Sequence, residues 1–281
     1  MNISLALISA SEQLGRAGID QQRREAASLL AFGISREAAF LIAHPEYELT
    51  VEEAARFEDA VRRRAGREPF QLIVGRQEFY GLNFEVESGV LIPRHETELL
   101  VERAVEILKN TERPSFFEAG VGTGCISVSI LHLIETAKAM AVDISEQALD
   151  LARRNAERHG VSGRLCLLKS DLFAIARGKF DIIVSNPPYI PLSDAKGLQP
   201  EVVEFDPPEA LFAGVDGLDI IRRIVAEAPQ FLIPQGYLLL EIGQGQAASV
   251  NALLGSDHWA SVEILADLQG IPRTLVARAV R

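Results

Sequence analysis

A short apolar segment that runs through a glycine-rich loop into an apolar helix constrains the fold of this chain more than any other feature. Ser115–Ala119 predicts a strand, the next five residues are Gly120-Val121-Gly122-Thr123-Gly124, and residues 125–131 predict a helix. Glycine tolerates positive φ and lets the backbone approach a ligand closely. A helix N-terminus adds free N–H groups and a partial positive charge. The order of strand, glycine loop and helix therefore predicts an α/β domain that binds a cofactor at this turn.

Further apolar segments predict the rest of a sheet. They lie at residues 138–142, 164–169, 180–184, 236–242, 261–265 and 274–279. Ser145 is a suitable N-cap for a helix that reaches Arg158, and Gly160 is a suitable stop. Seven strands with intervening helices predict a doubly wound, Rossmann-like sheet.

The remaining segments divide the chain into three parts. Residues 1–70 are rich in helical periodicity and predict a small helical bundle that docks a partner. Residues 71–92 predict a β-hairpin linker, because apolar and polar residues alternate around Tyr80-Gly81-Leu82-Asn83. Residues 93–281 form the α/β domain. Within it, residues 190–216 are rich in Pro, Asp and Glu and predict a long functional or mobile loop.

The tetrapeptide Asn186-Pro187-Pro188-Tyr189 directly follows the predicted buried strand at 180–184. Ligands of open α/β sheets bind beyond the carboxyl ends of the strands, so a catalytic role is expected here. The Asn186 oxygen and the Pro187 carbonyl can accept both N–H bonds of a planar amino group, and the prolines restrict the backbone. Tyr189 offers a flat face for stacking. These residues therefore suit methyl transfer to an amide or aromatic NH2 group.

The alternative interpretation is a proline-rich loop that merely ends a strand. We favour the functional interpretation, because asparagine precedes the prolines, an aromatic residue follows them, and the strand upstream is buried. No strong base is required, since the nitrogen can lose its proton after the methyl group has transferred.

The glycine loop and two acidic residues predict a site for S-adenosylmethionine. The Gly-x-Gly-x-Gly spacing suits this cofactor better than a dinucleotide, whose fingerprint would need a small residue where Cys125 or Ser127 stands. Asp143 follows a strand and can accept from both ribose hydroxyls, although it could instead be an acid at a helix N-terminus. Asp171 could accept from the adenine amino group, with Leu172 or Phe173 packing on the ring, or it could be an ordinary loop acid.

Composition excludes several functional classes. The net charge of −11 is unfavourable for a protein whose main partner is DNA. No signal peptide or membrane-spanning stretch is evident, so we expect a cytoplasmic protein with no membrane partner. Cys125 and Cys166 both fall in predicted core elements and are expected to be buried thiols of a reducing compartment. The histidines lack metal-ligand spacing, so no metal site is expected.

With these residues in view, the chain resembles the HemK/PrmC family, the N5-glutamine methyltransferases that modify class 1 peptide chain release factors. Asn-Pro-Pro-Tyr alone is less specific, because adenine-N6 DNA methyltransferases share it. The resemblance covers nearly the whole chain and is carried by Ala43-His44-Pro45-Glu46, Leu91-Ile92-Pro93-Arg94, Glu96-Thr97-Glu98, the glycine loop, Val142-Asp143-Ile144-Ser145, the segment 184–190 and Asp216-Gly217-Leu218-Asp219.

The resemblance implies a seven-stranded S-adenosylmethionine-dependent methyltransferase domain in which residues 120–124, Asp143 and Leu172 line the cofactor. It implies that Asn186 lies between cofactor and substrate, and that residues 186–189 hold the glutamine of a Gly-Gly-Gln tripeptide. The N-terminal helices are implied to contact the release factor, and S-adenosylhomocysteine is implied to be the product. The acidic charge balance leads us to expect no direct nucleic-acid partner.

Three residues depart from the family pattern. Glu118 stands where Asp is usual, His95 where Pro is common, and Leu172 where an aromatic residue is frequent. Two other functions stay open from the residues alone. One is adenine-N6 methylation of nucleic acid, and the other is a cofactor-binding module without catalytic activity.

Overall fold

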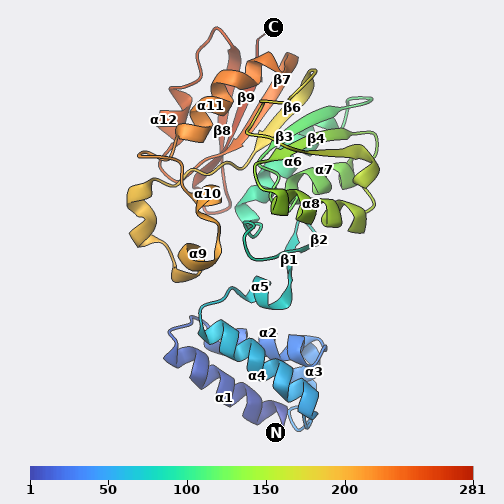
Figure 1. Cartoon of the computed structure of the whole chain (residues 1–281), viewed down its shortest axis with the longest axis vertical. Helices are drawn as coiled ribbons and strands as arrows, with labels where there is room; N and C mark the ends of the chain where they lie inside the picture. Colours follow the sequence, from blue (N-terminus) through green and yellow to red (C-terminus); the bar gives the residue numbers. More distant parts are fainter. Residues whose placement is uncertain (281) are drawn as a thin grey trace. The chain divides into compact units, whose positions relative to one another are not determined.

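The structure, a computed structural model, describes residues 1–280 and divides into two compact units (Figure 1). The first unit contains Met1–Arg76 together with Gln199–Phe205. The second contains Gln77–Leu198 and the chain from Asp206 onward. Seven residues, 199–205, therefore belong to the first unit although they follow most of the second unit along the chain.

The first unit is helical, as its periodicity predicts. Buried apolar side chains such as Leu14, Leu30 and Phe57 form its core. The helix at Val51–Ala65 begins at a capping box, in which the Thr50 hydroxyl accepts from Glu53 N and the Glu53 carboxylate accepts from Thr50 N. The helices are α1 (Ile3–Arg16), α2 (Gln22–Gly33), α3 (Ala38–Ala43), α4 (Val51–Ala65), α5 (Phe70–Val74) and α9 (Pro200–Phe205).

Helix α9 is held in this unit by charge. The Glu201 carboxylate lies 3.2 Å from both the Arg64 and the Arg67 guanidinium groups. Arg64 is only 8% exposed and also pairs with Glu25 at 3.1 Å. The prediction of one long loop over residues 190–216 is therefore wrong in part, because this segment contains a 3-10 turn at Leu192–Gly197, α9 and α10 (Pro208–Leu211). Pairing with arginines more than 130 residues away was not visible in local sequence.

The second unit contains the predicted seven-stranded sheet. Its order is β5-β4-β3-β6-β7-β9-β8, in which β5 to β7 pair in parallel and β9 runs antiparallel to both neighbours. The chain leaves β3 first toward β4 and then toward β6, so the order reverses beside β3. The strands are β3 (Ser115–Ala119), β4 (Lys138–Asp143), β5 (Leu165–Lys169), β6 (Phe180–Ser185), β7 (Leu232–Glu241), β8 (Trp259–Ala266) and β9 (Pro272–Ala279).

Alternation along the strands explains why helices cover both faces of the sheet (Figure 1). Phe116 and Ile182 lie in one core cluster, whereas Phe117 and Ile183, each one residue later, lie in the other. The first cluster contains residues of α6 (Glu98–Leu108), α7 (Cys125–Leu133) and α8 (Glu146–Arg158). The second contains residues of α11 (Asp219–Glu227) and α12 (Ala247–Asn251). The predicted hairpin is also present, as β1 (Arg76–Phe79) and β2 (Leu82–Glu85).

One expectation about the core is wrong. Cys125 is buried, but Cys166 is exposed. Cys166 lies on β5, which is an edge strand and lacks a neighbour on one side. A strand can thus be apolar in composition and still present a thiol to solvent.

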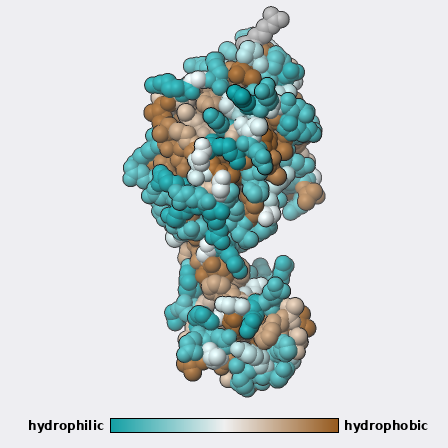
Figure 2. Space-filling model, turned by 90° about the vertical axis from the view of Figure 1, so that its right-hand side faces the viewer, coloured by the Kyte–Doolittle hydropathy of each residue, from teal (hydrophilic) through white to brown (hydrophobic). Residues whose placement is uncertain are grey.

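The molecular surface is mainly hydrophilic on the side shown in Figure 2, with apolar side chains in separate groups. This fits the net charge of −11. Within residues 1–280, no helix combines the length and the apolar character needed to cross a membrane.

The ion pairs of Arg64 predict a stability effect. Replacing Arg64 by Ala leaves Glu25 without its arginine and leaves Glu201 with Arg67 alone, so we expect the free energy of unfolding to fall by about 2 to 4 kcal/mol. Urea unfolding followed by circular dichroism measures it. The matched control is Arg62→Ala, because Arg62 is mostly exposed and, within residues 1–280, forms an ion pair only with Asp59, three residues away. An equal effect of both substitutions would contradict the role assigned to Arg64.

Candidate active site

A cavity of about 400 Å³ lies at the carboxyl ends of β3, β4, β5 and β6. It occupies the place beside β3 where the strand order reverses, which is where open α/β sheets bind their ligands. Its walls come entirely from the second unit and are formed by Gly89, Val90, Leu91, Ala119, Gly120, Gly122, Asp143, Ile144, Ser145, Ala148, Ser170, Asp171, Leu172, Ser185, Asn186, Pro187, Pro188, Pro207, Glu209, Ala210 and Ile220.

Two glycines of the loop after β3 line this cavity. Gly120 and Gly122 have φ values of +78° and +51°, a region that side chains other than glycine rarely adopt. An added Cβ would meet nothing within 4 Å at either position, so backbone conformation explains the glycines better than lack of space. Gly120 N and Val121 N both donate to Val142 O, at 2.9 and 3.0 Å, and these bonds hold the loop against the end of β4.

The other three loop residues, Val121, Thr123 and Gly124, do not line the cavity. Val121 and Thr123 are buried. Gly124 lies against α8, where an added Cβ would stand 3.1 Å from the Ala152 Cβ. The side chains of Val121 and Thr123 therefore pack inside the fold, and a contact of these three residues with a cofactor stays a prediction.

Asp143 reaches the cavity from the end of β4 and combines two roles. Its Oδ2 accepts from Gly122 N at 3.0 Å, and its Oδ1 accepts from Ser145 N at 2.9 Å. Each carboxylate oxygen has a further lone pair for a ligand. Asp143 can therefore stabilise the start of α8 and still accept from a ligand, so the two roles that the sequence analysis gives as alternatives are compatible.

Asp171 and Leu172 form another part of the wall, after β5. The Asp171 carboxylate pairs with Arg223 at 2.9 Å, so one of its oxygens is already engaged. Leu172 has φ of +47°, which is unusual for a residue with a side chain. Ser170 supports this turn by donating to Leu172 O at 3.1 Å. The strained turn presents an apolar side chain to the cavity.

Glu118 lies under the glycine loop and is not part of the cavity wall. It is 1% exposed, and its Oε2 accepts from both the backbone N, at 3.0 Å, and the hydroxyl of Ser127. Burial raises the pKa of Glu118 to about 8, although both bonds from Ser127 favour the charged form. The carboxyl thus satisfies the first turn of α7 rather than facing a ligand.

The tetrapeptide after β6 lines the cavity through Asn186, Pro187 and Pro188. Asn186 Nδ2 donates to Thr97 Oγ1 at 3.0 Å, and Thr97 Oγ1 donates to Glu241 Oε2 at 2.6 Å. A buried chain of polar groups therefore supports the asparagine from behind.

Tyr189 lies outside the cavity wall. Its hydroxyl donates to Glu241 Oε1 at 3.1 Å, and its carbonyl accepts from Gln246 Nε2 at 2.8 Å. Burial raises the pKa of the Tyr189 phenol, and the nearby Glu241 charge acts in the same direction. The ring anchors the end of the tetrapeptide here, and its stacking on a substrate stays a prediction.

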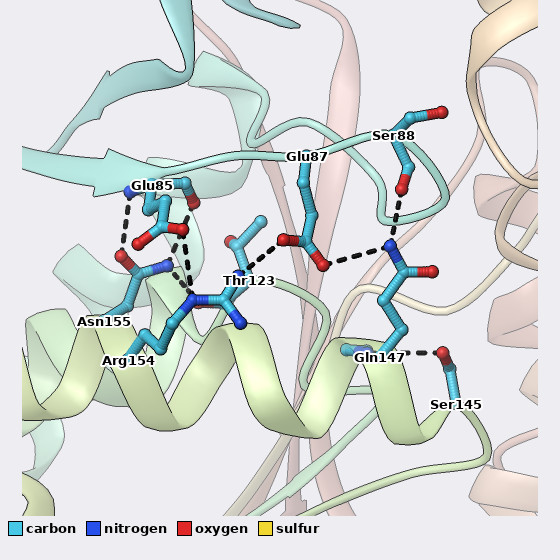
Figure 3. A network of polar contacts seen from close by, with 9 residues as sticks. Glu85, Glu87, Ser88, Thr123, Ser145, Gln147, Arg154 and Asn155 are labelled. Atoms are coloured by element: carbon cyan, nitrogen blue, oxygen red, sulfur yellow. Dashed lines mark hydrogen bonds and ion pairs between the residues drawn. The ribbon is translucent and has the colours of Figure 1, made fainter.

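The wall at residues 89–91 is supported by contacts between α8 and the segment after the hairpin (Figure 3). Asn155 Nδ2 donates to Glu85 O and Thr123 O at 3.0 and 2.9 Å, and its Oδ1 accepts from Glu85 N at 2.8 Å. Arg154 pairs with Glu85 and Glu87. One side chain of α8 therefore joins the hairpin to the glycine loop.

Several of these residues were missed from sequence alone, above all Thr97, Glu241 and Asn155. Glu241 carried a signal, because it is a charged residue within an otherwise apolar strand segment. Thr97 was noticed only as part of a family motif. Asn155 carried no signal, since a polar residue in an amphipathic helix is ordinarily exposed.

A group of side chains that could bind a metal lies away from the cavity. Glu78, His95 and Glu98 bring ligand atoms within 4.8 Å of one another, and Glu78 and His95 are exposed. The carboxylates already accept from Gly81 N and Tyr80 N. Exposed acidic groups of this kind are common, and nothing else in the described residues points to a cation there.

Two family models match this chain. Residues 6–75 match the PrmC N-terminal domain, and residues 96–204 match the methyltransferase small domain. The first match lies in the helical unit. The second contains the glycine loop, Asp143, Asp171 and the tetrapeptide.

Curated relatives match over the whole chain. The release factor glutamine methyltransferase of Koribacter versatilis is 40% identical over 280 residues, which cover 99% of each protein. That of Geobacter sulfurreducens is 41% identical over 266 residues, covering 94% of this chain and 92% of the relative. Among solved structures, the hMettl16 catalytic domain in complex with the MAT2A 3′UTR hairpin 6 has a TM-score of 0.58 at 17% identity, covering 80% of this chain and 81% of that chain. This last likeness shows the fold alone.

The contacts of Asn155 predict a second stability effect. Asn155 is fully buried, and Asn155→Ala leaves Thr123 O and Glu85 N without their side-chain partner. We therefore expect the free energy of unfolding, measured by chemical denaturation, to fall by about 2 to 5 kcal/mol. Arg154→Ala is the control one residue away, because its side chain is 41% exposed and its ion pairs should contribute about 1 kcal/mol or less. If the two variants unfolded at the same denaturant concentration, the role given to Asn155 would be wrong.

Proposed function

The chain belongs to the release factor glutamine methyltransferase (HemK/PrmC) family, and on that premise we propose that it methylates the side-chain nitrogen (N5) of the glutamine in the Gly-Gly-Gln motif of class 1 release factors. The observation that carries this proposal is that Asn186, Pro187 and Pro188 share one cavity with Asp143 and the glycine loop. Groups suited to gripping an amino group and groups suited to binding a nucleoside therefore face the same space.

The cavity walls fit S-adenosylmethionine, which supplies an electrophilic methyl group when bound. A volume of about 400 Å³ lies in the range of small-molecule sites. Asp143 would accept from the ribose hydroxyls, and Gly120 and Gly122 would admit the ligand close to their backbone. Leu172 would pack on the adenine, and the free oxygen of Asp171 would accept from its amino group. S-adenosylhomocysteine would be the product.

The tetrapeptide would act on the acceptor. An amide nitrogen is a weak nucleophile because its lone pair is delocalised into the carbonyl. Acceptors placed by Asn186 Oδ1 and the Pro187 carbonyl would hold both N–H bonds and favour a pyramidal nitrogen. Proline fixes its own φ and lacks an N–H, so neither proline competes for the site. A preorganised pair of acceptors thus replaces a strong base.

The helical unit would bind the release factor. It matches the PrmC N-terminal domain, and none of the cavity walls comes from it. Leu5 and Ile8 are three residues apart on α1 and are each 59% exposed, so they lie on one helix face open to a partner. Class 1 release factors are the protein partners that this assignment requires.

Adenine-N6 methylation of nucleic acid is the second candidate, since adenine also presents a planar NH2 group to such a tetrapeptide. The charge distribution favours it less. The net charge is −11, and the charged residues among the cavity walls are Asp143, Asp171 and Glu209, all acidic. The assay below includes this substrate class.

The acceptor can be tested directly with the purified full-length protein and S-adenosylmethionine. We expect a class 1 release factor to gain one methyl group on its Gly-Gly-Gln peptide in mass spectrometry. A release factor with that glutamine replaced by alanine is the control and should gain none. Methylation of an adenine-containing oligonucleotide, with the release factor unchanged, would support the second candidate instead.

Substitution of Asn186 separates catalysis from cofactor binding. We expect Asn186→Ala to lower turnover on the order of 100-fold or more while S-adenosylmethionine affinity changes little, because one preorganised acceptor is lost. Isothermal titration and a methyl-transfer assay measure the two quantities. Asp143→Ala is the matched comparison and should mainly weaken cofactor binding. A parallel loss of affinity and turnover in Asn186→Ala would instead make Asn186 a cofactor contact.

A further inference from the structure

Behind the tetrapeptide lies a buried carboxyl group that the proposed chemistry does not use. Glu241 is 1% exposed at the end of β7, and both of its hydrogen-bond donors are neutral hydroxyls, those of Thr97 and Tyr189. Burying a carboxyl in this way is costly, and an apolar residue would serve packing at least as well. The cost suggests that Glu241 has a task at the site.

The hydrogen-bond pattern around Thr97 fixes which way the Asn186 amide faces. Hydroxyl protons from both Thr97 and Tyr189 favour the ionised form of Glu241, which can only accept, so the single hydroxyl proton of Thr97 is engaged by Glu241 Oε2 at 2.6 Å. Thr97 Oγ1 can then interact with Asn186 only as an acceptor, which selects the NH2 end of the amide for the 3.0 Å contact. The Asn186 oxygen is thereby directed away from Thr97.

The alternative orientation would harm the proposed reaction. If the amide were turned over, Asn186 would present its own NH2 group where the incoming NH2 group needs an acceptor. Two donors would face each other, and the preorganised acceptor would be lost. Asparagine itself has no preference between the two orientations, so a neighbour must impose one.

We propose that Thr97 and Glu241 are positioning residues, which hold the Asn186 carboxamide with its oxygen available to the amino group of the acceptor. The role of the oxygen rests on the proposed function, whereas the orientation of the amide rests on the hydrogen bonds of Thr97 and on Glu241 accepting in its ionised form. Thr97 is 2% exposed and comes from the turn before α6, so the amide is set by an element distant in sequence from both β6 and β7.

The first test compares two substitutions of one residue. Thr97→Val keeps the shape of the side chain but removes the hydroxyl, so we expect kcat to fall about 10-fold to 100-fold, by analogy with residues that orient metal ligands through a hydrogen bond. Affinity for S-adenosylmethionine should stay within about 2-fold, since the donor walls are untouched. Thr97→Ser keeps the hydroxyl and should restore most of kcat. Wild-type kcat in Thr97→Val, or an equal loss in Thr97→Ser, would overturn the proposal.

The second test asks whether Thr97 acts through Asn186. In an Asn186→Ala background, Thr97→Val should cause little further loss of turnover, because the amide that it orients is already gone. Losses that multiply would mean that Thr97 acts elsewhere. Glu241→Gln should lose less than Thr97→Val, since its amide can still accept from Thr97 in one of its two orientations.

A third measurement does not depend on activity. In the NMR spectrum of the ¹⁵N-labelled protein, the Asn186 side-chain NH2 signals, assigned by their loss in Asn186→Ala, should resist solvent exchange in the wild type and in Thr97→Ser. Protection should be lost in Thr97→Val while backbone signals of the core stay in place. Protection that survives in Thr97→Val would overturn the proposal. A protein that shows this pattern yet methylates no release factor would refute the proposed function alone.

Discussion

The parallel pairing of β3 with β4 and β6 is the constraint from which the site follows. Its register sets Ala119 opposite Val142 and Glu118 opposite Val184, so three strands end at nearly the same level. The glycine loop, Asp143 and Asn186 come immediately after those ends. Residues separated by more than 60 positions in sequence thus meet at one edge without any long-range interaction of their own.

The local sequence pattern predicted those features of the fold that depend on neighbouring residues in the chain. Apolar alternation, glycine loops and cap residues located the strands, helix α8 with its N-cap Ser145, and the cavity residues on the loops after β3 and β6. Contacts between distant segments were not predictable in this way. Thr97 and Glu241 are 144 positions apart, and Glu201 reaches Arg64 across 137. The prediction that Cys166 is buried was wrong for a related reason, because its exposure depends on which strand lies at the edge of the sheet.

The buried side chains of Asn155 and Glu241 offset the free-energy cost of burying a polar group in different ways. Asn155 satisfies three hydrogen bonds with backbone groups, and it needs no charge to do so. Glu241 takes its bonds from hydroxyls, and burial raises its pKa. The amide joins elements of the fold and is fully matched by them. The Glu241 carboxylate accepts from both of its partners. By taking the hydroxyl proton of Thr97, it also determines which end of the Asn186 amide faces Thr97.

The return of the chain to its helical unit affects the order in which the protein can be completed. A ribosome makes the first 76 residues early, and their helices can begin to pack as they emerge. Arg64 and Arg67 nevertheless cannot pair with Glu201 until it has been translated, which happens only after four strands of the large sheet, β3 to β6. During that interval Arg67 lacks Glu201 and Arg64 has Glu25 alone, so the ion pairs made by α9 complete the helical unit late in synthesis.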